Sequence, residues 1–448
     1  MRRIALGLVL VTAAPSDATA AARAHDGGTL RLAVLPEVRA DRWGDTPEGA
    51  VLRSLVAAPL CHLEAGGRVQ AVLASTQRSA DAVSVVLRTG ARFPSGTPLG
   101  AAELARAWTR AIERSPVARA ALAPVRDAAA TLEQQARGRG GTLVLPLAHP
   151  WPDLESTLCH PALAPIAGEG PGGGIGPYAP DGADRGRAVP SFPDGRPHPD
   201  AFAVTALSRR AAQRALETRT AQVLLGDGGE PSAPALLATY LVSRPGSRPL
   251  VALLEPRLDR AALVRSFVGA PAAAMPGLLP PALGGPERGA ASGSPGRGSG
   301  TAVLMYAADR PAQRAVAQRL QILLRDAGVQ LTLAPRTPEA LDRDWRTGQG
   351  DLALRSVLLP PAPAAALAVV LELAGDASAS HRELAPLGAL ADAGERAART
   401  RERALQLSAT LPVLPLYAEG LRARLDPALV DVRRDGFGLW MLDDAWWP

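Results

Sequence analysis

The chain has 448 residues, of which 47% are hydrophobic and 21% are charged. This balance is that of a globular protein and excludes a disordered chain. At roughly 150 residues per domain, the length predicts two or three domains. The net charge of +6 would suit nucleic-acid binding, but all 49 basic residues are arginines and are spread among 43 acidic residues. We therefore expect no nucleic-acid partner.

Residues 1–24 have the pattern of a signal peptide. Two arginines precede the short apolar run 4–14, and both Ala18-Thr19-Ala20 and Ala22-Arg23-Ala24 fit the A-x-A cleavage rule. The alternative is a buried N-terminal helix. Export predicts a periplasmic protein in an oxidising compartment. Beyond this segment no apolar run approaches the ~18 residues of a membrane span.

Two cysteines, Cys61 and Cys159, follow the signal peptide. An even count in an oxidising compartment predicts one disulfide. Each cysteine precedes a histidine, His62 or His160, so a Cys/His metal site is an alternative, although the usual C-x2-C and H-x3-H spacings are missing. Two buried free thiols are a third possibility. We predict no metal site and no cofactor.

In chain order, strands and helices alternate. Period-two or short apolar runs predict strands at 28–34, 83–87, 142–147, 201–207, 222–225 and 236–243. Helices are predicted after Gly100, where Leu104, Trp108 and Ile112 recur every four residues, and at 209–218. The Gly/Ser/Pro/Arg-rich segment 284–300 is predicted to be a flexible loop.

The clearest unit follows this loop. A strand at 302–306, a helix that begins at Pro311 and ends at Gly328, and a strand at 329–333 predict a right-handed parallel crossover. The order of elements indicates an α/β architecture with several domains.

Motifs of common enzymes are missing from the sequence. It contains no G-x-x-x-x-G-K-[ST], no H-E-x-x-H and no G-x-S-x-G in a strand–turn–helix context. We therefore expect no enzymatic activity. A secreted hydrolase with a dispersed catalytic triad is the least favoured alternative, because residues far apart in the chain leave no local motif.

Several phrases occur in the order typical of one family. They are GGTLR at 27–31, LRTGARFPSGTPLGAAE at 87–103, GDLA at 350–353 and LPVLPLY at 411–417. On these phrases the chain resembles the extracellular solute-binding proteins of family 5, which serve peptide and nickel ABC importers. The phrases extend from residue 27 almost to the C-terminus.

The resemblance implies an α/β, two-lobed periplasmic binding protein fold of type II, with an extra inserted domain and a hinge between the lobes. It implies a monomer that captures an oligopeptide-like or related small solute and delivers it to an ABC permease in the inner membrane. The alternative is a scaffold now used for sensing or protein interaction without import. By position, lobe one is 27–53, 158–242 and 425–448, the inserted domain is 54–157, and lobe two is 243–424.

The resemblance also implies where the solute contacts lie. They would follow the first strand, occupy a strand near residue 240, follow the GDLA phrase and end the LPVLPLY phrase. For each residue, a place in the core or hinge is the alternative, and Arg355 is either a clamp for an anionic solute group or one half of an ion pair between the lobes. The stretch 357–363 lacks the aspartate and aromatic residues of many peptide binders, so recognition of a free amine is in doubt. The candidates are Glu37, Val38, Tyr240, Arg355, Val357, Leu358 and Tyr417.

Overall fold

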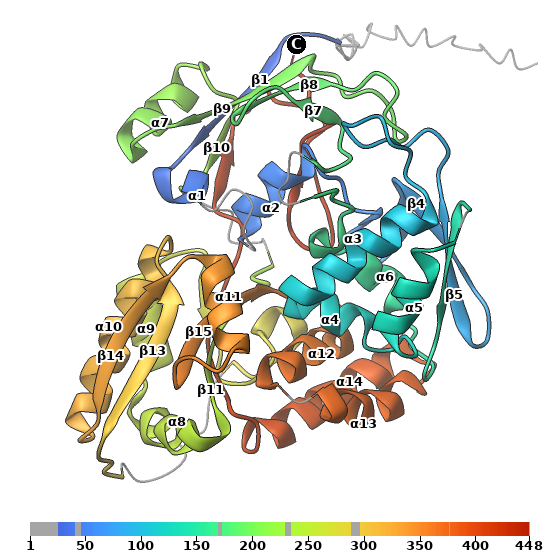
Figure 1. Cartoon of the computed structure of the whole chain (residues 1–448). Helices are drawn as coiled ribbons and strands as arrows, with labels where there is room; N and C mark the ends of the chain where they lie inside the picture. Colours follow the sequence, from blue (N-terminus) through green and yellow to red (C-terminus); the bar gives the residue numbers. More distant parts are fainter. Residues whose placement is uncertain are drawn as a thin grey trace, which may run out of the picture.

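The computed structural model describes residues 26–40, 46–138, 140–168, 173–228, 234–287, 296–375 and 377–447. The signal peptide expected at residues 1–24 lies outside this part of the chain. The described residues form two large sheets with helices around them, and a third unit beside the two (Figure 1). No helix in these ranges is long and apolar enough to cross a membrane.

The first sheet lies at the top of Figure 1 and has the strand order β17-β10-β1-β9-β8-β7. β1 pairs in parallel with β9 and β10, and the outer strands pair antiparallel. Leu32 and Ala33, which point to opposite faces of β1, are both 1% exposed, so helices and loops cover both faces. The elements are β1 (Thr29–Val34), α1 (Pro36–Ala40), α2 (Pro47–Ser54), β7 (Tyr178–Pro180), β8 (Arg185–Ala188), β9 (Ala201–Ala206), α7 (Arg209–Glu217), β10 (Val223–Leu225) and β17 (Ala423–Leu425).

The second sheet has the order β12-β16-β11-β15-β13-β14. Its strands are β11 (Leu237–Ser243), β12 (Ala272–Ala274), β13 (Thr301–Ala307), β14 (Gln330–Arg336), β15 (Leu352–Leu358) and β16 (Val413–Glu419). The helices around it are α8 (Arg248–Leu254), α9 (Arg260–Leu263), α10 (Pro311–Asp326) and α11 (Pro338–Arg346). β13, α10 and β14 form the predicted parallel crossover. Helix α10 ends before Gly328 as expected, because Gly328 has φ +97° and a residue in the left-handed conformation stops a helix.

The chain crosses between the sheets twice, after β10 and between β16 and β17. The expected end of lobe one at residue 242 is therefore too late, because β11 is a central strand of the second sheet. All seven residues of β11 are buried. A strand that is buried on both faces shows no alternation of polar and apolar residues that could assign it to one sheet or the other. The prediction therefore relied on sequence order, which placed β11 in the wrong lobe.

The inserted domain occupies the right of Figure 1. Its antiparallel sheet has the order β4-β5-β6, beside a β2–β3 hairpin. Helix α3 begins as predicted, since the Gly100 N–H donates to Glu103 Oε2 at 3.1 Å. The elements are β2 (Cys61–Leu63), β3 (Val69–Ala71), β4 (Ala74–Arg78), β5 (Ala82–Leu87), α3 (Ala101–Arg114), α4 (Pro116–Leu122), α5 (Ala128–Gln135), β6 (Thr142–Pro146) and α6 (Leu154–Leu158).

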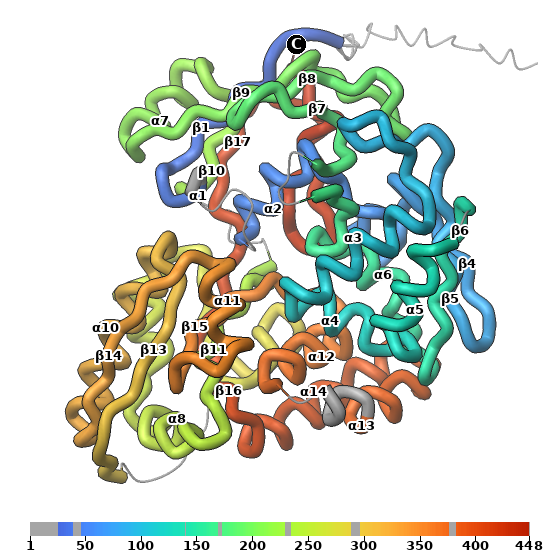
Figure 2. The backbone as a smooth tube through the Cα atoms, in the orientation of Figure 1, coloured from blue at the N-terminus to red at the C-terminus, as the bar shows by residue number. Residues whose placement is uncertain are grey.

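Three helices from the second half of the chain pack on the inserted domain. They are α12 (Pro363–Ala374), α13 (Ala377–Gly388) and α14 (Ala393–Ser408). Figure 2 shows α12 beside α4. Helix α12 is apolar on most of its surface, with nine buried residues, as expected for a helix enclosed on several sides. The inserted domain and the first sheet share one hydrophobic core with α12.

The segment 284–300 differs in part from the flexible loop predicted for it. Residues 288–295 lie outside the described chain. The Gly298 N–H donates to the Ala327 carbonyl at 2.8 Å. A Cβ at Gly298 would lie 2.6 Å from Leu253 and 2.9 Å from Val329. The C-terminal end of this segment is therefore packed, because glycine permits a close approach that its composition alone does not reveal.

Candidate functional site

Four of the expected solute contacts lie in the hydrophobic core. Val38 is 5% exposed, Val357 2% and Leu358 3%. Tyr240 is fully buried and its hydroxyl donates to the Leu278 carbonyl at 2.8 Å. A buried tyrosine usually finds such a partner, so this hydroxyl is already used within the fold. These four residues fit the alternative given in the sequence analysis, a place in the core, better than they fit contact with a solute.

Arg355 has neither of the two roles expected from the sequence, a clamp for an anionic solute group or an ion pair between the lobes. Its guanidinium lies 2.6 Å from Asp342 of α11, within the same lobe, and the residue is 8% exposed. Asp342 also pairs with Arg346 at 2.9 Å. Arg355 is therefore committed to a neighbour 13 residues earlier in the chain, and not to the opposite lobe. Sequence reasoning missed this pair because helix α11 was not among the predicted elements.

Tyr417 lies in a buried polar network at one end of the second sheet. In the strand register Thr239 is opposite both Tyr417 and Ser356. The Thr239 and Ser356 hydroxyls are 2.7 Å apart, and Gln313 of α10 donates its amide N–H to Ser356 Oγ at 2.7 Å. Gln313 Oε1 accepts the Ala307 N–H at 2.9 Å. Burial raises the pKa of Tyr417, so its hydroxyl stays protonated.

Charged residues from both lobes meet beside this network, where the chain returns from β16 to β17. The Arg422 N–H donates to Oε1 of Glu48, on α2, at 2.8 Å, and its guanidinium lies 3.5 Å from the same carboxylate. Glu419, at the end of β16, is 3.8 Å from Arg422 Nη2. Glu48 is 2% exposed and Glu419 8%. Burial raises the pKa of Glu419, Glu48 adds to this, and Arg422 opposes it.

Glu37, of α1, faces the same guanidinium. Burial lowers the pKa of Arg422, but the carboxylates of Glu48, Glu419 and Glu37 outweigh it, so that the pKa is raised. We call this set the interlobe polar cluster; its members are Glu37, Glu48, Thr239, Gln313, Ser356, Tyr417, Glu419 and Arg422. Chemically, it offers hydroxyl, amide, carboxylate and guanidinium groups that can hold a small polar molecule; Glu48 and Glu419 are buried, whereas the Arg422 side chain is 31% exposed.

Two of the seven sequence candidates, Glu37 and Tyr417, belong to the interlobe polar cluster. Sequence reasoning missed Glu419 and Glu48. A signal for Glu419 was present, because it lies two residues after Tyr417 and residues i and i+2 of a strand share a face. A carboxylate in the otherwise apolar run 413–419 therefore pointed to the same site. No local signal marks Glu48, which lies on a short helix far away in the sequence.

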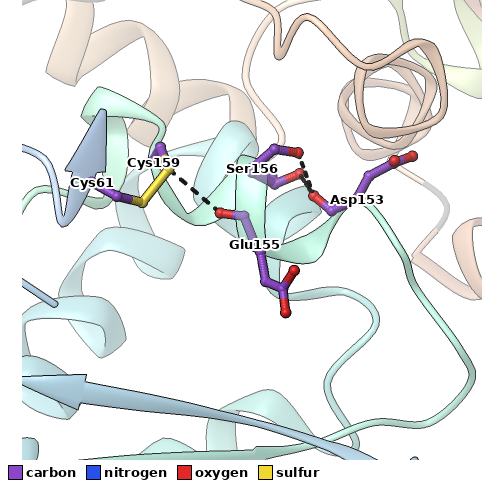
Figure 3. The surroundings of a disulfide bond; sticks show 6 residues. Cys61, Asp153, Glu155, Ser156 and Cys159 are labelled. Carbon is purple, nitrogen blue, oxygen red and sulfur yellow. Dashed lines mark hydrogen bonds between the residues drawn. A yellow bond between two sulfur atoms is a disulfide. The ribbon is translucent and has the colours of Figure 1, made fainter. Parts of the chain in front are cut away.

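The cysteines form the predicted disulfide. Cys61 of β2 is bonded to Cys159, which follows α6, 98 residues later (Figure 3). Its neighbour His160 is 2% exposed; Nε2–H donates to the Leu358 carbonyl at 2.9 Å, and Nδ1 accepts the Ala162 N–H. Burial lowers the pKa of His160 to about 3. Both ring nitrogens are therefore used by the backbone, and the Cys/His metal alternative does not hold for this pair.

No protein-family model and no curated protein sequence matches the chain. Among solved structures, the murein tripeptide binding protein MppA of Escherichia coli is 17% identical, with a TM-score of 0.70 over 95% of this chain and 99% of that one. OppA of Haemophilus influenzae, bound to the peptide RPPGFSPFR, is 14% identical, with a TM-score of 0.70 over 94% and 99%. AgaA of Agrobacterium tumefaciens, bound to agropinic acid, has the same identity, TM-score and coverage.

These likenesses confirm the fold predicted from the sequence, that of the two-lobed periplasmic binding proteins. They confirm the resemblance to family 5 at the level of the fold. MppA in its unliganded open form has a lower TM-score, 0.55. The arrangement of lobes here is therefore closer to that of the first MppA structure than to the open form.

Proposed function

We propose that the chain is a divergent member of solute-binding protein family 5. It captures an oligopeptide-like or related small solute in the periplasm and passes it to an ABC permease, without catalysing a reaction. The observation that carries this proposal is the interlobe polar cluster. Proteins of the same fold bind a murein tripeptide, a longer peptide and agropinic acid, all of which have several polar groups.

Arg422 gives the cluster a way to couple solute binding to lobe position. Its guanidinium lies between Glu48 of the first lobe and Glu419 of the second. A solute that bonds to either carboxylate changes the balance of charge around Arg422 and favours one arrangement of the lobes over another. This is how we expect the hinge to respond to the solute.

The composition of the cluster favours a zwitterionic or amide-rich solute. Glu37, Glu48 and Glu419 offer acceptors for an ammonium or amide N–H, and Arg422 offers donors for a carboxylate or carbonyl. An apolar solute would replace water around these groups without offering them hydrogen bonds, which costs free energy. The stretch 357–363 lacks the aspartate with which many peptide binders hold the ammonium group of the ligand. In this chain Glu419 would supply that carboxylate.

Native mass spectrometry of protein purified from its host, followed by thermal shift with the solute found or with di- and tripeptides, tests the proposal. A solute at about 100 times its Kd adds ~2.7 kcal/mol to the free energy of unfolding. Glu419→Gln should weaken binding by roughly 2 kcal/mol or more. The control Glu402→Gln, a side chain 57% exposed on α14, should leave it unchanged. Equal loss in both variants contradicts a role for Glu419.

A scaffold without a soluble ligand is the second candidate. It is favoured by one observation: five of the seven expected contact residues are occupied with the core or with an internal ion pair. Protein that carries no solute from its host and is stabilised by no peptide tested would support this second candidate and overturn the first.

A further inference from the structure

Three side chains with metal-binding atoms meet at the junction of the inserted domain and the first lobe. They are His62 on β2, Asp194 in the loop before β9, and Asp443, which follows β19 (Trp440–Met441) near the C-terminus. One ligand atom of each lies within 4.8 Å of the others. The three come from distant parts of the sequence, so only the fold brings them together.

The imidazole of His62 is largely buried, and the nearby carboxylate of Asp194 acts on it electrostatically. His62 is 8% exposed, and across the described ranges no residue forms a hydrogen bond with either ring nitrogen. Burial lowers the pKa of His62, so the ring is neutral and keeps a lone pair for a metal ion.

The two carboxylates repel one another and are only partly compensated. Asp194 accepts from Arg88 at 3.2 Å, while among the described residues no basic side chain forms an ion pair with Asp443. Its neighbour Asp444 takes the guanidinium of Arg433. Burial, with Asp444 adding to it, raises the pKa of Asp443 to about 6. Burial also raises the pKa of Asp194, and Asp443 adds to this.

His62 and Asp443 also line a small pocket between α2 and the C-terminal segment. Asp435 lines the same pocket, but its Oδ1 accepts the N–H groups of Phe437 and Leu439 at 2.9 and 2.8 Å. Asp435 is therefore held by the backbone, and it is His62, Asp194 and Asp443 that bring their ligand atoms within 4.8 Å of one another.

We propose that His62, Asp194 and Asp443 bind one divalent transition-metal ion of the zinc class. One imidazole and two carboxylates suit Zn²⁺, whereas Mg²⁺ and Ca²⁺ prefer oxygen ligands alone. The ligand atoms lie within 4.8 Å of one another, and bonds of ~2.1 Å to one tetrahedral ion would bring them to about 3.4 Å. Small side-chain rotations would bring all three ligand atoms onto one ion. The positive charge of the ion would then neutralise the two carboxylates.

The site ties the C-terminal segment to the inserted domain. Cys61 and His62 are neighbours on β2 and point to opposite faces of the strand. The disulfide thus fixes one face, and the metal ion fixes the other. This site contains no member of the interlobe polar cluster, so the inference goes beyond the proposed function and does not depend on it.

Zinc titration of protein freed of metal by a chelator tests the site. We expect one equivalent of Zn²⁺ to bind, to raise Tm by several degrees, and to resist competition by Mg²⁺. Asp443→Asn and His62→Gln should each weaken zinc binding at least tenfold. The control Glu402→Gln, on an exposed part of α14, should leave it within twofold. The variant Glu419→Gln, defective in the proposed solute site, should bind zinc as the unaltered chain does.

The pH dependence gives a second readout that needs no variant. Affinity for zinc should fall as the pH is lowered below neutral, because protons compete with the metal ion for the imidazole and carboxylate ligands. Zinc affinity that is equal in Asp443→Asn, Asp194→Asn and the unaltered protein overturns the proposal, since the ion then binds elsewhere. So does the lack of a stoichiometric zinc site in folded protein at neutral pH.

Discussion

The inserted domain is held by two junctions whose charges are arranged in opposite ways. Toward α14, Arg396 meets Asp153 through two contacts, at 3.2 and 3.0 Å, and its side chain is 7% exposed. A second pair, Arg119 and Glu372, lies 3.3 Å apart nearby. Toward the C-terminal segment, Asp194 and Asp443 face a neutral His62. The first junction matches its charges, whereas the second is only partly compensated, by Arg88 on Asp194.

The difference indicates what each junction depends on. A buried pair with matched charge and two contacts is stable without help, provided that neither partner is removed. A junction with two carboxylates and a neutral ring gains stability from a proton or a metal ion. We therefore expect the α14 junction to respond to mutation and the C-terminal junction to respond to pH and metal.

Breaking the matched junction should have the largest effect. Asp153→Ala leaves Arg396 buried without its partner, and we expect a loss of roughly 3–5 kcal/mol in the free energy of unfolding. The control Glu402→Ala removes the partner of Arg399 on the same helix, where both side chains are more than half exposed, and should change it by less than about 0.5 kcal/mol. Urea denaturation measures both. Equal effects in the two variants would show that the junction is no stronger than a surface pair.

Removal of the disulfide should have the next largest effect. The double variant Cys61→Ala with Cys159→Ala should lose roughly 2–4 kcal/mol, because the bond closes a long loop in the unfolded chain. Reductant should lower the stability of the unaltered protein and leave the variant unchanged. Two reactive thiols in denatured, unreduced protein would contradict the bond itself.

The unmatched junction should respond to pH. The pKa of Asp443 is raised to about 6 in the fold, so the folded state binds more protons than the unfolded state between about pH 4 and pH 6. In metal-free protein its contribution to stability is present below this range and is lost as the pH rises through about 6. Allowing for partial exposure, the loss is on the order of 1–2 kcal/mol.

Denaturation of metal-free protein at several pH values measures this loss. Asp443→Asn should reduce the slope without abolishing it, because burial also raises the pKa of Asp435, which lines the same pocket, to about 7. Other groups near the junction are His62, Asp194, Arg88, Asp444 and Arg433, and Asp444 itself adds to the raised pKa of Asp443. The distant variant Glu402→Gln is therefore the control, and a slope in Asp443→Asn equal to that of the unaltered protein would assign the effect elsewhere.

The smallest expected effect concerns Arg355, which forms a third matched pair, within the second lobe. Arg355→Met should change affinity for the solute by less than about twofold, because the guanidinium serves Asp342 and not the solute. Stability should fall more clearly than affinity. Isothermal titration with the solute from the host measures the affinity, and a tenfold loss would restore the clamp role inferred from the sequence.

Features that depend on residues close together in the sequence could be predicted, whereas contacts between distant residues could not. The crossover of β13, α10 and β14 followed from local periodicity, and the disulfide followed from cysteine count and compartment. Arg355 shows where prediction from sequence ends. A guanidinium in an apolar strand indicates that it needs a charged partner, but the sequence does not identify that partner. His62, Asp194 and Asp443 show the same limit more strongly, since nothing local relates three residues brought together only by the C-terminal segment.

The central place of β1 in the first sheet determines the order in which a chain emerging from its N-terminus can fold. The sheet of the inserted domain needs only residues from Ala74 to Pro146, so it can form early. β1 must wait for β9 and β10, and the sheet is finished only when β17 arrives at Ala423–Leu425. The strand nearest the N-terminus is therefore among the last to be fully enclosed, and until then its unpaired apolar edges are open to aggregation.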